Sequence, residues 1–188
     1  VNITNKSSKF MKILFGPAGL GPISCAEKTL EEFSKLGLKA CEIAFTYEVY
    51  IKNEEDAIII GKKARELGIE LSIHASYFVN LNSAEKAKRE ATKKRILDCC
   101  KVGELLGAKV VVFHPGYYSK NREESYSIIK EGILEMMKEI KKNIWKIRIA
   151  PETMGKINVF GSIEEISALA KETGCSFCLD FAHILARD

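Results

Sequence analysis

The 188-residue sequence lacks an apolar run long enough to cross a membrane, since a spanning helix needs about 18 or more consecutive apolar residues. It also lacks the apolar core of a signal peptide, because its first nine residues are mostly polar. Neither sign of charge dominates: 29 Lys and Arg face 25 Asp and Glu, a balance that does not by itself indicate a nucleic-acid binder. With 46% hydrophobic and 29% charged residues, the composition excludes a disordered or collagen-like chain and predicts a globular domain or a large part of one.

Cysteine is too sparse for a disulfide framework, and its spacing does not form a zinc finger. The six cysteines include one C-x-x-C pair, Cys175 and Cys178, with no second pair at zinc spacing. We interpret them as reduced thiols, which predicts a cytoplasmic protein. The glycine-rich segment 16–21 fits neither the dinucleotide fingerprint nor a phosphate loop, so we expect no nucleotide cofactor.

Short β-branched or apolar runs alternate with longer amphipathic runs along the chain. The predicted strands are Lys12–Phe15, Ala40–Phe45, Glu70–His74, Lys109–His114, Ile147–Glu152 and Ser176–Asp180. Each amphipathic run between them is followed by a residue that tolerates left-handed backbone: Gly37, Gly68, Gly107, Asn143 or Gly174. The order implies an α/β fold with a parallel sheet, and both a doubly wound open sheet and a (β/α)₈ barrel fit it.

The only three histidines and two carboxylates fall at or just past the ends of four consecutive predicted strands. These five residues are His74, His114, Glu152, Asp180 and His183. In a barrel those strand ends share one rim, where active sites lie. Singly, each has an ordinary explanation, such as a structural hydrogen bond for a histidine or a helix cap for Asp180. Together they predict a metal site, and imidazole with carboxylate suits zinc, manganese or iron.

Four segments carry a more specific pattern: SIHASYFVNL at 72–81, VFHPG at 112–116, APETMGK at 150–156 and LDFAH at 179–183. Together they resemble the endonuclease IV family of apurinic/apyrimidinic endonucleases, within the wider xylose-isomerase-like barrels. The resemblance runs from about Lys12 to the last residue and implies a (β/α)₈ TIM barrel. Such a barrel needs eight strands and typically about 250 residues, so we expect a barrel truncated after about six strands. We interpret residues 1–10 as a non-native or disordered leader and residues 11–188 as the N-terminal part of a single barrel domain.

The resemblance implies a cluster of three metal ions, usually zinc, in an enzyme of base excision repair. The reaction would be hydrolysis of the DNA phosphodiester on the 5′ side of an abasic site. By motif, His74, His114 and Glu152 would hold one ion. Glu152 would bridge to a second ion bound by Asp180, and His183 would belong to a third. Glu152 is also the candidate catalytic residue, because a bridging carboxylate can orient the attacking water.

DNA containing abasic sites is the partner that the resemblance implies. Tyr77 and Phe78 match the place where the family inserts side chains into the minor groove, and aromatic wedges are known to unstack bases. The alternative is that both rings simply pack within their loop. The family's best-known members also carry a basic residue shortly after the position of Phe45-Thr46-Tyr47, and this sequence departs from that pattern with Glu48, Val49 and Tyr50.

Two other functions remain open from the sequence. One is a sugar isomerase or epimerase on the related barrel, with one divalent metal, a proton-transfer base and no DNA contact. The other is a barrel fragment without activity. The segments around His74 and His114 favour the nuclease, because sugar isomerases of this type rely more on carboxylates.

Overall fold

The computed structural model describes residues 13–187. The proposed leader, residues 1–10, lies outside this range, as does Lys12 of the first predicted strand. A short 3₁₀ helix, Ile23–Cys25, precedes the first α-helix. The helices are α1 (Ala26–Lys35), α2 (Glu54–Leu67), α3 (Lys86–Leu106), α4 (Arg122–Lys142), α5 (Ile163–Thr173) and α6 (Phe181–Arg187). The strands are β1 (Ala40–Ala44), β2 (Glu70–His74), β3 (Val110–Phe113) and β4 (Arg148–Pro151).

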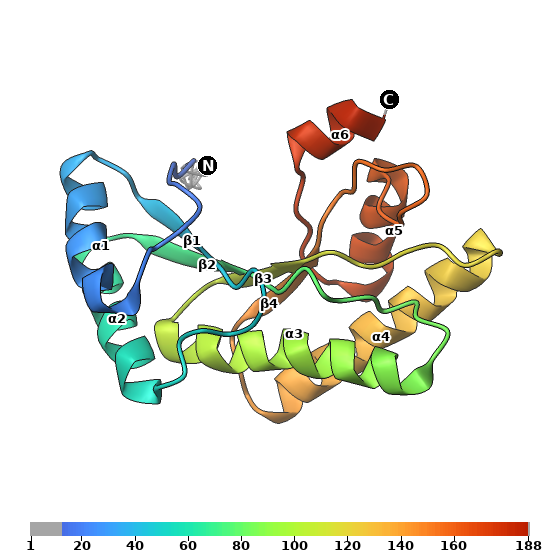
Figure 1. The fold of residues 1–188 in the computed structure, drawn as a ribbon, viewed down its shortest axis with the longest axis horizontal. Helices are drawn as coiled ribbons and strands as arrows, with labels where there is room; N and C mark the ends of the chain where they lie inside the picture. The colour runs from blue at the N-terminus through green and yellow to red at the C-terminus, as the bar shows by residue number, and fades with distance from the viewer. Residues whose placement is uncertain (1–12, 188) are drawn as a thin grey trace, which may run out of the picture.

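The four strands form one parallel sheet in the order β1-β2-β3-β4, which confirms the predicted α/β class. Each lies within one residue of its predicted bounds. In β1, Cys41 and Ile43 are buried between the sheet and the helices, whereas Glu42 is only half-buried. Consecutive helices contact each other from α1 to α5, and Figure 1 shows α3 and α4 running along one side of the sheet while α6 stands on the other. This is the βα order of a partial TIM barrel.

The first and sixth predicted strands are present as extended segments, each with a single β-bridge. Segment 13–18 pairs with β1 through the parallel bridge between Ala18 and Glu42. Segment 176–180 pairs with the residue that follows β4, through the parallel bridge between Cys178 and Glu152. A proline interrupts each ladder. At the first segment, the Ala40 amide donates to the Phe15 carbonyl, but Pro17 has no N–H with which to form the second bond of that bridge. At the last segment, the Ser176 amide donates to the Ile149 carbonyl, and Pro151 likewise has no N–H for the second bond. The described sheet therefore has four full strands rather than six.

Four of the five predicted left-handed helix ends are confirmed. The glycines at these ends have φ between 66° and 77° and are Gly37, Gly68, Gly107 and Gly174. The prediction for Asn143 is wrong: it has φ −83°, and the left-handed residue is Ile144, at φ 59°. The Asn143 side-chain amide donates to the Glu139 carbonyl, which keeps Asn143 on the last turn of α4. No helix in residues 13–187 combines the length and apolarity needed to cross a bilayer.

Candidate metal centre

The strand register brings the predicted ligands to one end and one face of the sheet. His74 is the last residue of β2 and pairs with Val112 of β3, which in turn pairs with Ala150 of β4. Because side chains alternate along a strand, His114 and Glu152, two residues further on, point to the same face as His74. The sheet thus sets three potential ligands side by side.

Glu152 is at the centre of this arrangement. Its side chain is buried, with one carboxylate oxygen, Oε2, 3.2 Å from His74 Nε2 and 2.9 Å from His114 Nε2. Burial alone would raise the pKa of the carboxyl, but the hydrogen bonds from His114 and His74 outweigh it and lower the pKa to about 2. Glu152 is therefore an ionised carboxylate, hydrogen-bonded between the imidazoles of His74 and His114.

Two main-chain carbonyls fix the orientation of the histidines. His74 Nδ1 lies 2.8 Å from the Ala75 carbonyl, and His183 Nδ1 lies 2.8 Å from that of Thr153. A carbonyl only accepts, so each Nδ1 carries a proton; Nε2 is then free to bind a metal in the neutral ring and donates a hydrogen bond only when the ring is protonated. Burial alone would lower the pKa of His74, yet the bonds to Glu152 and Ala75 together raise it above its ordinary value.

The structure forms two donor sets that share Glu152. Ligand atoms of His74, His114 and Glu152 lie within 4.8 Å of one another, and so do those of Glu152, Asp180 and His183. Two imidazoles with a carboxylate, and two carboxylates with an imidazole, are donor chemistry that suits a divalent ion such as zinc, manganese or iron. The residues present therefore fit a divalent metal.

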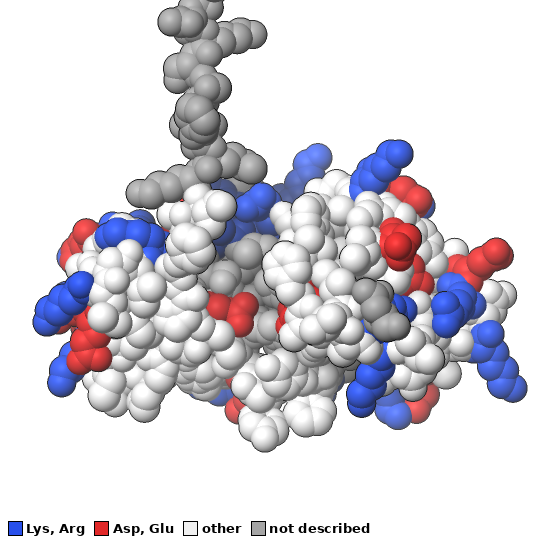
Figure 2. Space-filling view, turned by 90° about the horizontal axis from the view of Figure 1, so that it is seen from above, with Lys and Arg blue, Asp and Glu red and all other residues white. Residues whose placement is uncertain are grey.

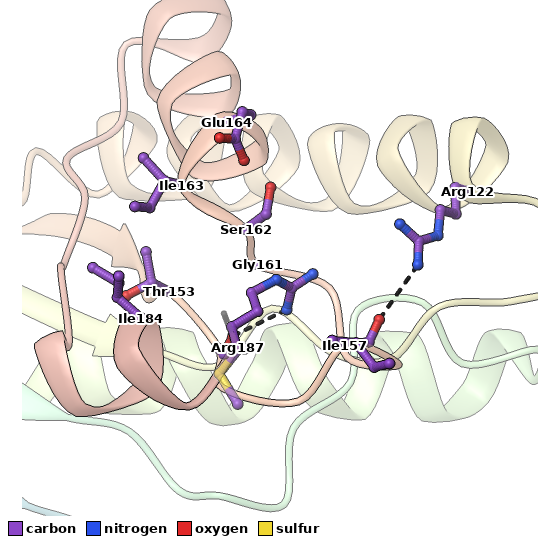
Figure 3. A pocket seen from close by; sticks show the side chains of 10 residues that line it. Arg122, Thr153, Ile157, Gly161, Ser162, Ile163, Glu164, Ile184 and Arg187 are labelled. Atoms are coloured by element: carbon purple, nitrogen blue, oxygen red, sulfur yellow. Dashed lines mark hydrogen bonds between the residues drawn. The ribbon is translucent and has the colours of Figure 1, made fainter.

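Asp180 and His183 are positioned by α6 and its attachments. Asp180 Oδ1 accepts from the His183 amide at 2.8 Å, so the helix cap considered from the sequence is real and leaves Oδ2 as a potential ligand atom. Arg187 anchors the other end of α6. Its guanidinium donates to the carbonyls of Met154, Lys156 and Val159 and to the Tyr118 hydroxyl, and Figure 3 shows it reaching from α6 toward this loop.

All five predicted ligands line one open cavity of about 480 Å³, together with Tyr77, Leu179 and Glu42. The face of the molecule on which α6 stands is hollowed, with acidic side chains in the hollow (Figure 2). Sequence reasoning missed two residues here. Glu42 was detectable, because it alternates with the buried Cys41 and Ile43 of a predicted strand.

Cys178 is the second missed residue: the C-x-x-C spacing singled it out together with Cys175, but it did not point to a contact with Glu152. Its Sγ donates to Glu152 Oε1 at 3.6 Å, so both carboxylate oxygens of Glu152 have partners. Burial, followed by the neighbouring Glu152 carboxylate, raises the pKa of this thiol to about 12. Cys178 is thus a neutral donor that helps to hold Glu152.

Tyr77 and Phe78 share a loop but take different positions. The Tyr77 ring stacks on His114, with centroids 5.2 Å apart and an angle of 12°, and it lines the cavity. Phe78 instead stacks on Tyr47, at 5.9 Å and 25°, and both rings are well exposed. The buried Ser76 hydroxyl joins the two loops, since it donates to the Tyr47 carbonyl and accepts from the Phe78 amide. Tyr77 thus borders the candidate metal centre, and Phe78 forms an exposed aromatic pair with Tyr47 on the neighbouring loop.

Residues 30–188 match the family described as xylose isomerase-like TIM barrel. Among curated proteins, the chain is 37% identical over 180 residues to the uncharacterized protein MJ0133 of Methanocaldococcus jannaschii, covering 93% of this chain and 63% of that protein. It is 27% identical over 150 residues to the endonuclease 4 homolog of Dictyostelium discoideum, covering 75% of this chain and 27% of that protein.

Two solved structures show the same fold. Endonuclease IV from Thermus thermophilus has a TM-score of 0.68 at 24% identity and covers 90% of this chain. D-psicose 3-epimerase from Clostridium cellulolyticum has a TM-score of 0.71 at 16% identity and covers 86%. The chain spans 62% of the former structure and 60% of the latter, as it spans 63% of the Methanocaldococcus protein.

Proposed function

Because the chain belongs to the xylose isomerase-like TIM barrel family, we propose that it acts as a metal-dependent endonuclease that hydrolyses DNA on the 5′ side of abasic sites. The observation that carries this proposal is the sharing of Glu152 by two donor sets, which favours a cluster of ions over a single one. We propose zinc as the metal, with up to three ions. When bound, these ions would supply positive charge for the phosphate and activate water near neutral pH.

The residues of the chain would hold the ions and orient the attacking water. His74 and His114 would hold the first ion through Nε2, and Asp180 and His183 would complete the second set. Glu152 would join both sets and orient the attacking water through a carboxylate oxygen. The Cys178 thiol would keep that carboxylate in place from its other side.

Tyr77 and Phe78 are proposed as the DNA contacts. Phe78 is 62% exposed and Tyr77 is 50% exposed, and large apolar rings gathered at a surface usually mark a contact site. Tyr77 reaches over His114, so a ring in the minor groove would lie directly beside the metal centre. The likeness to endonuclease 4 proteins supports a DNA substrate.

The test is cleavage of a duplex with one abasic site by the zinc-loaded protein, with metal content measured on the same samples. Glu152→Gln should lose zinc and lower the cleavage rate by at least about 100-fold, because even outer partners of metal ligands cost roughly 10- to 100-fold. Glu70→Gln is the matched control, since Glu70 is an exposed strand glutamate at the opposite end of the sheet. Cleavage and zinc content that survive Glu152→Gln would contradict the proposal.

A sugar epimerase with one divalent metal is the second candidate. The D-psicose 3-epimerase fold and the additional carboxylate of Glu42 in the cavity favour it. One bound ion per chain, conversion of a ketohexose and no cleavage of abasic DNA would select this function instead.

A further inference from the structure

Glu42 occupies the floor of the cavity that holds the candidate metal ligands. In the sheet register it pairs with Ser72, one layer below the pair of Ala44 and His74. Its backbone is fixed on both sides: the Glu42 amide donates to Pro17 at 3.0 Å, and its carbonyl accepts from Gly19 at 2.8 Å. The position of this carboxylate is therefore set by the sheet and by the segment that precedes it.

The carboxylate of Glu42 has no hydrogen bond or ion pair with any side chain or main-chain group of residues 13–187. Every other carboxylate that lines the cavity has one: Glu152 with His74 and His114, and Asp180 with the His183 amide. Burial raises the pKa of Glu42; the nearby His74 opposes this shift and Glu152 adds to it. The Glu42 carboxylate is half-buried and opens onto the cavity, so it is free to accept a hydrogen bond from a molecule bound there.

Glu42 also lies outside both donor sets. The ligand atoms within 4.8 Å of one another belong to the five predicted ligands and do not include Glu42. It nevertheless lines the same open cavity as they do. It therefore faces whatever reacts at the metal centre without belonging to that centre.

From this position we infer that Glu42 is a substrate-contacting residue, which accepts a hydrogen bond from a sugar hydroxyl at the floor of the cavity. The inference rests on the proposed function and names the feature of the substrate that the site reads. An abasic deoxyribose carries a hydroxyl on C1, where an intact nucleotide carries its base. Glu42 would thus favour the abasic sugar by binding a group that only this sugar offers.

Two duplexes that differ at one atom test this inference. One contains a natural abasic site, with its C1 hydroxyl, and the other a tetrahydrofuran site, with hydrogen there. Glu42→Ala should lower kcat/KM on the natural site by roughly 10- to 100-fold, as expected for a lost hydrogen bond to a charged group, and leave the tetrahydrofuran site unchanged. Glu42→Gln keeps an acceptor oxygen and should lose less. Glu70→Ala and Glu70→Gln are the matched controls.

Metal content separates this role from that of a ligand. The Glu42 variants should bind as much zinc as the wild-type protein, and a loss of zinc would overturn the inference. Equal losses on both duplexes, or no loss on either, would also overturn it. If Glu42→Ala does not fold, the isosteric Glu42→Gln carries the test, with a loss confined to the natural site.

Failure of the proposed function has a different signature. A wild-type protein that cuts neither duplex would refute the nuclease but leave the hydroxyl contact testable with a free sugar. Weaker binding of D-fructose by Glu42→Ala than by the wild-type protein would then support the same role for Glu42. Equal binding, or none by the wild-type protein, would overturn it.

Discussion

Replacing Glu152 by glutamine should change how the stability of the metal-free protein depends on pH. Glu152 is 6% exposed; burial alone would raise the pKa of its carboxyl, but the hydrogen bonds from His114 and His74 lower it to about 2, against about 4.3 in an unfolded chain. A group whose pKa is lowered by folding adds stability above its unfolded pKa, and this stability is lost as the pH falls through the folded value. A shift of about two units corresponds to about 3 kcal/mol.

The effect of Glu152 can be separated only in part from that of His74. The raised pKa of His74 adds stability at pH values below its unfolded pKa of about 6.5, and this stability is lost as the pH rises through the folded value. Below about pH 5 the imidazole is protonated in both states, so His74 no longer contributes to the slope. In the wild-type protein the window from about pH 5 to pH 2 therefore reports on carboxylates. In Glu152→Gln the imidazole of His74 loses the partner that offsets its burial, so part of the difference between the two proteins belongs to His74.

Urea unfolding in the presence of a chelator measures this difference. Between about pH 5 and pH 2 the wild-type protein should lose more unfolding free energy than Glu152→Gln, by up to about 3 kcal/mol. Glu70→Gln should follow the wild-type curve, because the Glu70 side chain is exposed and its carboxylate has no hydrogen-bonded partner among residues 13–187. Parallel curves for the wild-type protein and Glu152→Gln would refute the reasoning.

Three further variants test how the site is supported. Ser76→Ala should lower the free energy of urea unfolding by about 0.5–1.5 kcal/mol, because it removes the buried hydroxyl that donates to the Tyr47 carbonyl and accepts from the Phe78 amide; an unchanged midpoint would contradict this. Arg187→Ala should speed amide hydrogen exchange in α6 and leave exchange in α2 as it is, since its bonds anchor only α6. Gly61→Val should lower the free energy of unfolding by at least about 1–3 kcal/mol, because even a Cβ at Gly61 would overlap the Leu106 carbonyl where α2 contacts α3. A variant that unfolds at the same temperature as the wild-type protein would disprove that contact.

Hydrophobic periodicity predicted the four full strands, because each strand either alternates buried and exposed residues or is a short apolar run covered by helices. The two outer ladders were less predictable. Pro17 and Pro151 look compatible with strand ends in the sequence, but each stands where the parallel ladder needs an N–H. Whether a proline falls on a donating position depends on the register between strands, which a single sequence does not define.

The candidate ligands were predictable for a similar reason, since the ends of parallel strands meet at one rim. Their exact partners were not. Cys178 and Glu152 lie 26 positions apart in the sequence, and their pairing depends on the bridge between those two residues. Glu42 was within reach of the alternation rule, yet a charged residue in a predicted strand is compatible with a solvated face until the cavity in front of it is known.

The two donor sets rest on supports of unequal stiffness. His74 ends β2 and His114 follows β3, and both strands are paired on both sides, so the two positions are fixed by the ladders of β2 and β3. Asp180 and His183 follow a segment with one bridge, and Arg187 anchors the helix that carries His183. A ligand already held in place loses less conformational entropy when an ion binds. The set of His74, His114 and Glu152 is therefore better organised than the set of Glu152, Asp180 and His183. Glu152 follows β4 directly and belongs to both sets, so it connects the ligands held by the sheet to those that depend on α6.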